Sequence, residues 1–178
     1  MAQIRVAVFI DGSNLHHRLE QCGWPQRIDI GTLAKRLAGN RQLVRVAYYN
    51  VPPPPHRAPA AGARQRRYYA RISEDAQVEF TLGYLQRRIV DGRSVYEEKG
   101  VDVQIAVDML TGAFRDVYDV AVLVSSDGDF RPAVEAVREV GKRVEYICFP
   151  GATRSSALVR SASVSRQCRR AWITGYDE

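Results

Sequence analysis

Acidic side chains follow two apolar, strand-like segments of this 178-residue chain, at the point where each segment ends. Asp11 comes directly after the apolar run 4–10 and opens the tetrapeptide Asp-Gly-Ser-Asn. Asp127 and Asp129 follow the apolar run 119–125. In open α/β sheets, ligand sites form beyond the carboxyl ends of the strands. The sequence therefore predicts a cluster of carboxylates at that edge of a sheet.

Two further acidic positions lie in the segment 99–110, which has the pattern of a helix and its start. Asp102 falls at the expected helix start, whereas Asp108 interrupts an apolar run and, if buried, needs a partner or a cation. Six residues separate the two side chains, so they differ by about 240° of helical azimuth and cannot both point squarely at one ion. We therefore rank Asp102 first. Asp108 is either a ligand or a hydrogen-bonding partner behind the ligands.

Helix capping is the alternative explanation for these acids. Aspartate is a favoured N-cap residue, and the helix dipole stabilises a carboxylate in the first turn. One such cap would be ordinary. Two acidic turns, each punctuated by glycine and each following a buried strand, favour a shared site instead.

The residue types indicate which ion such a site would bind. Four or five aspartates with no histidine or cysteine nearby suit Mg²⁺ or Mn²⁺, which prefer oxygen ligands, and suit zinc poorly. The three cysteines have no metal-ligand spacing, and their odd number argues against a disulfide scaffold. This cysteine usage leads us to expect a reduced, cytoplasmic protein.

The charge balance favours a polyanionic partner. Lysine and arginine total 26 against 20 aspartate and glutamate residues, a formal net charge of +6, and only three of the basic residues are lysines. Arginine suits phosphate recognition, although genome composition can also raise arginine content. Two stretches mix arginine with tyrosine, and such mixtures suit single-stranded RNA; a solvated helix face with inward tyrosines is the alternative. The arginines are Arg64, Arg66, Arg67, Arg87 and Arg88.

Strands and helices alternate along the chain in an order that predicts a parallel sheet with helices on both faces. The expected strands are residues 4–10, 43–50, 119–125 and 143–149. Asp91-Gly92 lies between alternating segments and predicts a hairpin within 78–95. No apolar run approaches ~18 residues, so no membrane span is expected. The length fits one ordinary domain.

Three blocks of the sequence resemble, in order, the signature blocks of the NYN domain, and more narrowly of its LabA-like branch within the PIN-like nuclease superfamily. The blocks are FIDGSN at 9–14, KGVDVQIAVDM at 99–109 and LVSSDGDF at 123–130. The resemblance spans roughly residues 4–150 and implies a Rossmann-like, three-layer α/β/α sandwich with a mostly parallel central sheet. One departure is Ser126, where glycine is usual in this branch.

The resemblance also implies metal-dependent ribonuclease chemistry. It places the family's acidic, catalytic and metal-binding positions on Asp11, Asp102, Asp127 and Asp129. Supporting positions fall on Asn14, Ser125 and Asp108. We expect the domain to occupy residues 1–150, followed by an arginine-rich segment, 151–178, that packs on the same domain.

Together, the residues and the resemblance predict a cytoplasmic ribonuclease that hydrolyses single-stranded RNA at an aspartate-rich Mg²⁺ or Mn²⁺ site. A catalytically weak RNA-binding or regulatory module that keeps the metal pocket stays open, because metal binding alone does not establish turnover. A phosphatase of the haloacid-dehalogenase type needs a second aspartate two residues after the first, where this chain has Ser13. The sequence leaves homodimer formation open.

Overall fold

The computed structural model describes residues 3–55, 58–151 and 154–176. A six-stranded sheet with the order β3-β2-β1-β6-β7-β8 forms its centre. The strands are β1 (Arg5–Asp11), β2 (Gln42–Asn50), β3 (Val78–Leu82), β6 (Val120–Val124), β7 (Arg143–Cys148) and β8 (Val164–Gln167). Every neighbouring pair in this sheet is parallel.

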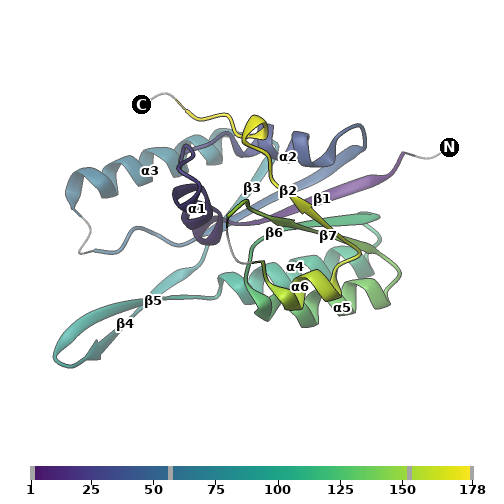
Figure 1. Ribbon diagram of the computed structural model, residues 1–178. Coiled ribbons are helices and arrows are strands. Elements are labelled where there is room, and N and C mark those ends of the chain that lie inside the picture. The colour runs from purple at the N-terminus through teal and green to yellow at the C-terminus, as the bar shows by residue number, and fades with distance from the viewer. Residues whose placement is uncertain (1–2, 56–57, 152–153, 177–178) are drawn as a thin grey trace.

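Helices cover both faces of the sheet and complete a three-layer arrangement (Figure 1). On one face lie α1 (Gly12–Gln21), α2 (Ile30–Ala38) and α3 (Pro59–Glu74). On the other lie α4 (Val101–Phe114), α5 (Arg131–Glu139) and α6 (Ser156–Ser161). Two single turns of 3₁₀ helix, η1 (Gly128–Phe130) and η2 (Arg170–Trp172), complete the helical elements of the described residues. The predicted α/β/α sandwich is confirmed.

The apolar core is split by the sheet into two layers. In β1, Val6, Val8 and Ile10 pack toward α1, α2 and α3, whereas Ala7 and Phe9 pack toward α4 and α5. All five of these side chains are fully buried. A strand covered on both faces needs a continuous apolar run rather than an alternating one, which is what the sequence shows.

Two edge strands of the sheet, β3 and β8, differ from the sequence-based expectation of four strands. Both are short and only partly buried, and neither carries the continuous apolar run of a central strand. β8 lies in the arginine-rich segment and pairs with β7. Among the described helices, none is long and apolar enough to cross a membrane.

The predicted hairpin is present with its turn at Asp91-Gly92, but it spans 84–99 rather than lying within 78–95, and it stands apart from the main sheet. It consists of β4 (Tyr84–Val90) and β5 (Arg93–Lys99), which form a separate two-stranded antiparallel sheet. Its turn residues Asp91 and Gly92 both have positive φ, 49° and 74°, as a tight hairpin turn requires. The hairpin projects from the body of the molecule and leads back into α4 (Figure 1).

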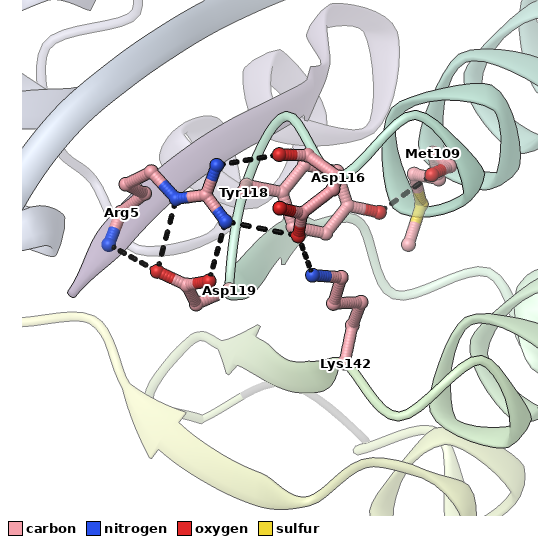
Figure 2. A network of polar contacts seen from close by, with 6 residues as sticks. All are labelled: Arg5, Met109, Asp116, Tyr118, Asp119 and Lys142. Atoms are coloured by element: carbon pink, nitrogen blue, oxygen red, sulfur yellow. Dashed lines mark hydrogen bonds and ion pairs between the residues drawn. The ribbon is translucent and has the colours of Figure 1, made fainter.

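A charged network joins the amino-terminal ends of the two central strands (Figure 2). The guanidinium of Arg5 lies 2.7 Å from Asp119 and 2.9 Å from Asp116, measured from Nη2 to the carboxylate oxygens. The backbone N–H of Arg5 also donates to Asp119 at 2.8 Å, and Lys142 pairs with Asp116. These contacts fix β1 beside β6 from one end and leave the opposite, carboxyl end of both strands open for a site.

The direction of strand addition reverses between β1 and β6. From β1 the chain moves outward to β2 and β3, then returns to β6 and continues outward to β7 and β8. Asp11 is the last residue of β1, and Ser125 directly follows β6. The fold therefore brings the two acidic turns to the topological switch point, where open α/β sheets bind ligands.

Candidate functional site

A buried serine joins the two acidic turns. The hydroxyl of Ser125 donates to Oδ2 of Asp11 at 2.9 Å and accepts a hydrogen bond from the backbone N–H of Asp127 at 3.2 Å. Ser125 is 1% exposed and Asp11 is 6% exposed, so this link is shielded from water. One side chain thus sets the spacing between the turns after β1 and β6.

A second link comes from α1. The side-chain oxygen of Asn14 accepts a hydrogen bond from the backbone N–H of Ser126 at 3.0 Å. One turn further along α1, Nε of Arg18 donates to the Ser126 hydroxyl at 3.1 Å. Glycine at position 126 would lack this last contact. Asn14 and Arg18 therefore clamp the turn after β6 against α1.

Both acidic turns also cap helices, as the capping alternative predicts. Asp11 Oδ1 accepts the backbone N–H of Asn14 at 3.0 Å, at the start of α1. Asp127 Oδ1 accepts the backbone N–H of Asp129 at 2.9 Å, at the start of η1. Each cap occupies one carboxylate oxygen. Within the described residues, Oδ2 of Asp127 has no hydrogen-bond partner, so capping leaves this oxygen available for a ligand.

Asp102 approaches the same place from α4. It lies in the first turn of that helix, two residues after Gly100, whose positive φ of 86° turns the chain from β5 into α4. Asp129 lies in η1, beside Asp127. The carboxylates of Asp102 and Asp129 make no hydrogen bond or ion pair within the described residues.

Electrostatic coupling shows that these acids share one region. The pKa of Asp11 is raised to about 6, mainly by burial; the hydrogen bonds from Asn14 and Ser125 lower it, and the charges of Asp102 and Glu98 raise it. Burial also raises the pKa of Asp102. The carboxylates of Asp127, Glu98 and Asp129 add to that rise. The neighbouring carboxylates therefore make Asp11 and Asp102 harder to ionise.

Glu98 is the member of this group that sequence reasoning missed. It lies on β5, four residues before Asp102, within the segment that turns into α4. Its carboxylate makes no ion pair in the part of the chain that the structure describes, whereas the adjacent Glu97 pairs with Arg88 and Lys99. The available signal was its position directly before the Lys99-Gly100 dipeptide of the second sequence block.

Asp108 has different partners. The hydroxyl of Tyr49 donates to its Oδ2 at 2.7 Å, Gln104 donates to Oδ1 at 3.2 Å, and Arg45 lies 3.6 Å away. The fold thus supplies the partner that the sequence analysis expected for a buried acid. Among the described residues, none of the other candidate acids contacts Asp108.

The described residues contain no group of three or more histidine, cysteine, aspartate or glutamate side chains arranged to hold a metal ion directly. The neighbouring carboxylates raise the pKa of Asp11 and of Asp102, but the acids do not converge on a common point.

A cavity of about 660 Å³ opens beside the acids. Its wall combines residues of α1 and α3, the end of β2, and one face of the β4–β5 hairpin. Four tyrosines and two arginines are among its lining residues: Tyr48, Tyr68, Tyr69, Tyr96, Arg27 and Arg64. Glu98 belongs to the same wall, so the cavity and the acids adjoin.

The five arginines predicted to bind RNA do not lie together. Arg64 lines the cavity, whereas Arg66 and Arg67 are exposed on α3 outside its lining. Arg87 and Arg88 are neighbours on β4 and therefore point to opposite faces of the hairpin.

A family model for the NYN domain matches residues 5–166. The chain belongs to the NYN domain family. The match includes all three sequence blocks that carry the acids, and it extends past residue 150 into the arginine-rich segment that contributes α6 and β8. The NYN family is related to nucleases, so the resemblance stated from the sequence is confirmed at the level of the family.

Two individual proteins are similar to this NYN chain. The low amplitude and bright protein LabA of Synechococcus elongatus is 30% identical over 158 residues, which cover 83% of this chain and 75% of LabA. A crystal structure of a protein of unknown function from Vibrio parahaemolyticus matches with a TM-score of 0.73 at 22% identity, covering 97% of each chain. The second likeness shows the fold alone, and it agrees with the predicted Rossmann-like, PIN-like architecture.

Proposed function

We propose that this NYN protein is a metal-dependent ribonuclease that hydrolyses phosphodiester bonds of single-stranded RNA. The reaction centre is the acid cluster, by which we mean Asp11, Glu98, Asp102, Asp127 and Asp129. The observation that carries the proposal is that these carboxylates gather at the switch point of the sheet while no basic side chain of the described residues pairs with any of them.

Several acids outside the acid cluster, by contrast, are paired with cationic side chains. Glu145 is bound by two arginines, and Asp119 is bound by Arg5. Asp108 has Arg45 as its cation. Uncompensated carboxylates repel one another and resist ionisation. Their assembly in a chain with a net charge of +6 favours a cation supplied from solution.

The donor set suits Mg²⁺ or Mn²⁺. All five members of the acid cluster offer hard oxygen ligands, with no histidine or cysteine among them. Mg²⁺ usually keeps several waters and takes only one or two carboxylates, which agrees with acids that are not closed around a common point. Such an ion would neutralise charge on the phosphoryl oxygens and activate a water molecule near neutral pH.

The chain's own residues divide into ligands and positioning residues. Asp11 and Asp127 hold the principal ion, and Asp102 and Asp129 complete that site or hold a second ion. Ser125 keeps the first two carboxylates at a fixed spacing through its two hydrogen bonds.

Asn14 contributes through the other half of its side chain. Its amide oxygen already accepts the Ser126 N–H, and its Nδ2 has no partner within the described residues. Nδ2 is therefore the group that can donate to a substrate oxygen at the edge of the acid cluster.

A catalytically weak RNA-binding module is the second candidate. The observation that favours it is the lack, among the described residues, of three side chains arranged to bind a metal directly. Such a module would keep the RNA-binding arginines and the acid pocket without turnover.

Cleavage of a labelled single-stranded RNA with Mg²⁺ or Mn²⁺ tests the proposal. We expect metal-dependent cleavage by the wild type and a loss of at least about 100-fold in Asp11→Asn and Asp127→Asn, because each substitution keeps the size of the side chain and removes a ligand charge. The matched control is Asp91→Asn at the hairpin turn, where asparagine tolerates the positive φ. A wild type that binds RNA but never cleaves it establishes the binding module instead.

A further inference from the structure

The cavity beside the acid cluster shares a wall with it. Glu98 lines the cavity and also acts electrostatically on Asp11 and Asp102. Ser13, the second residue of α1, lines the same cavity two positions after Asp11. A phosphodiester bound at the acid cluster therefore has this cavity directly beside it, on the side of α1 and α3.

The wall of the cavity is held in a fixed shape by its polar groups. Tyr48 is 2% exposed, and its hydroxyl accepts a hydrogen bond from Nδ2 of Asn50 at 2.9 Å. The hydroxyl of Tyr69 donates to the carbonyl of Val51 at 3.0 Å, and that of Tyr68 donates to a backbone carbonyl before α2, also at 3.0 Å. These hydrogen bonds fix the three tyrosine hydroxyls at the cavity wall, while the rings of Tyr48 and Tyr69 pack into the core.

The hairpin supplies the opposite wall. In its register, Leu85 pairs with Glu98 and Arg87 pairs with Tyr96, so these side chains share one face. Leu85, Tyr96 and Glu98 from that face line the cavity. Arg87, directly opposite Tyr96, extends the same face away from the acid cluster.

We propose that this tyrosine-lined cavity is a subsite for one unpaired nucleotide of the RNA strand, adjacent to the phosphodiester at the acid cluster. The inference rests on the proposed function. Tyr96 presents its ring to the base, and Arg64 presents its guanidinium to a flanking phosphate. Arg64 makes no ion pair within the described residues, so its charge is available for that contact.

The size and lining of the cavity support this occupant. Small-molecule sites occupy about 300–1,000 Å³ and combine apolar or aromatic walls with a few polar groups. A base inside a duplex is stacked and paired, whereas a base of a single strand can be splayed out onto an aromatic side chain. A cavity that takes one splayed-out base would favour unpaired RNA over a duplex.

Binding assays in the Asp127→Asn background separate this subsite from cleavage. Fluorescence anisotropy of a labelled single-stranded RNA and of a duplex of the same length would be compared for Tyr96→Ala, Tyr96→Phe and Arg64→Gln. We expect Tyr96→Ala and Arg64→Gln to raise the Kd for the single strand about 10-fold, which is the usual effect of losing one stacked base or its phosphate contact. Tyr96→Phe keeps the ring and should bind as the parent does.

Two matched controls lie outside the cavity. Tyr84→Ala removes a tyrosine from the opposite face of the same hairpin, where its side chain is 61% exposed. Arg36→Gln removes an exposed arginine in the last turn of α2. This end of α2 leads into the start of β2, at the amino-terminal end of the strands and therefore away from the acid cluster. Each should change the Kd for the single strand less than about twofold, since only the general electrostatic attraction is altered.

Equal effects of Arg64→Gln and Arg36→Gln, together with no effect of Tyr96→Ala, would overturn the subsite and leave only surface attraction. An equal loss of single-strand and duplex binding in Tyr96→Ala would also overturn it. The nuclease proposal can fail while the subsite is retained. This would be the outcome if the wild type never cleaves RNA but Tyr96→Ala still weakens single-strand binding.

Discussion

At the residue scale, Ser125 holds the centre of the acid cluster together, because its hydroxyl contacts both Asp11 and the turn that carries Asp127. The pair Asp11 and Asp127 could be predicted from the sequence, since each follows a short, β-branched apolar run that is typical of a buried strand. The azimuth argument that separates Asp102 from Asp108 agrees with their different surroundings: Asp127 and Asp129 act electrostatically on Asp102, whereas Asp108 accepts a hydrogen bond from Tyr49.

Glu98 could not be predicted in the same way. The face of the hairpin on which the Glu98 side chain lies depends on the hairpin register. That register pairs Glu98 with Leu85 on the face that lines the cavity, and it places the side chain of the neighbouring Glu97 on the opposite face. A one-residue slip of the register would exchange the two glutamates, and their position before Lys99-Gly100 does not by itself fix the register.

The substitution Ser125→Ala tests the positioning role. We expect RNA cleavage to fall about 10- to 100-fold, the usual cost of losing a residue that orients metal ligands, while RNA affinity stays unchanged. Kinetics with separately measured Kd would distinguish the two quantities. Ser126→Gly is the control, because it keeps the backbone N–H that binds Asn14 and should retain most activity. A Ser125→Ala protein that cleaves like the wild type would show that the spacing of the turns needs no such link.

At the scale of elements, the parts that could be predicted are those with strong local signals. The central strands follow from their apolar runs, and the hairpin turn follows from Asp91-Gly92. β3 and β8 are edge strands whose half-exposed sequences carry no such run, so their pairing is decided by neighbouring strands rather than by local pattern.

The junction of β1 and α1 imposes a close approach that only glycine permits. A Cβ at Gly12 would lie 2.5 Å from the hydroxyl of Tyr48 and 2.5 Å from Nδ2 of Asn50, both buried. We therefore expect Gly12→Ala to lower the free energy of unfolding by about 1–3 kcal/mol, as overpacking does, measured by urea denaturation.

Gly62→Ala provides the comparison. Gly62 is inside α3, and the nearest atom to its added Cβ is the end of the Arg66 side chain at 3.3 Å. Alanine is the better helix former, so this variant should gain up to about 1 kcal/mol. If Gly12→Ala were as stable as the wild type, the contact between α1 and the end of β2 would have to be looser than described.

At the scale of the whole molecule, one buried carboxylate joins three segments that are distant in sequence. Glu145 on β7 accepts hydrogen bonds from Arg41, which precedes β2, at 2.7 Å and from Arg166 on β8 at 2.6 Å. Burial alone would raise the pKa of Glu145, but the hydrogen bonds from Arg41 and Arg166 outweigh it and leave the pKa below its usual value.

This network predicts how stability depends on pH. Because the pKa of Glu145 is lower in the folded state, its ionised form stabilises the fold above the usual glutamate pKa of about 4.5, and that contribution is lost as pH falls through the lower folded value. Urea denaturation between about pH 7 and pH 3 should show the wild type losing more stability than Glu145→Gln. Equal losses of stability in the two proteins would show that Glu145 does not contribute to the acid sensitivity.

The central claim at this scale is that a basic chain gathers uncompensated acids in order to hold a divalent cation. Titration with Mn²⁺, with free Mn²⁺ followed by electron paramagnetic resonance, tests it without requiring an RNA substrate. We expect the wild type and Asp91→Asn to bind Mn²⁺ equally and Asp127→Asn to bind at least about 10-fold more weakly. A wild type that leaves millimolar Mn²⁺ free, or an Asp127→Asn protein with unchanged affinity, would contradict the claim.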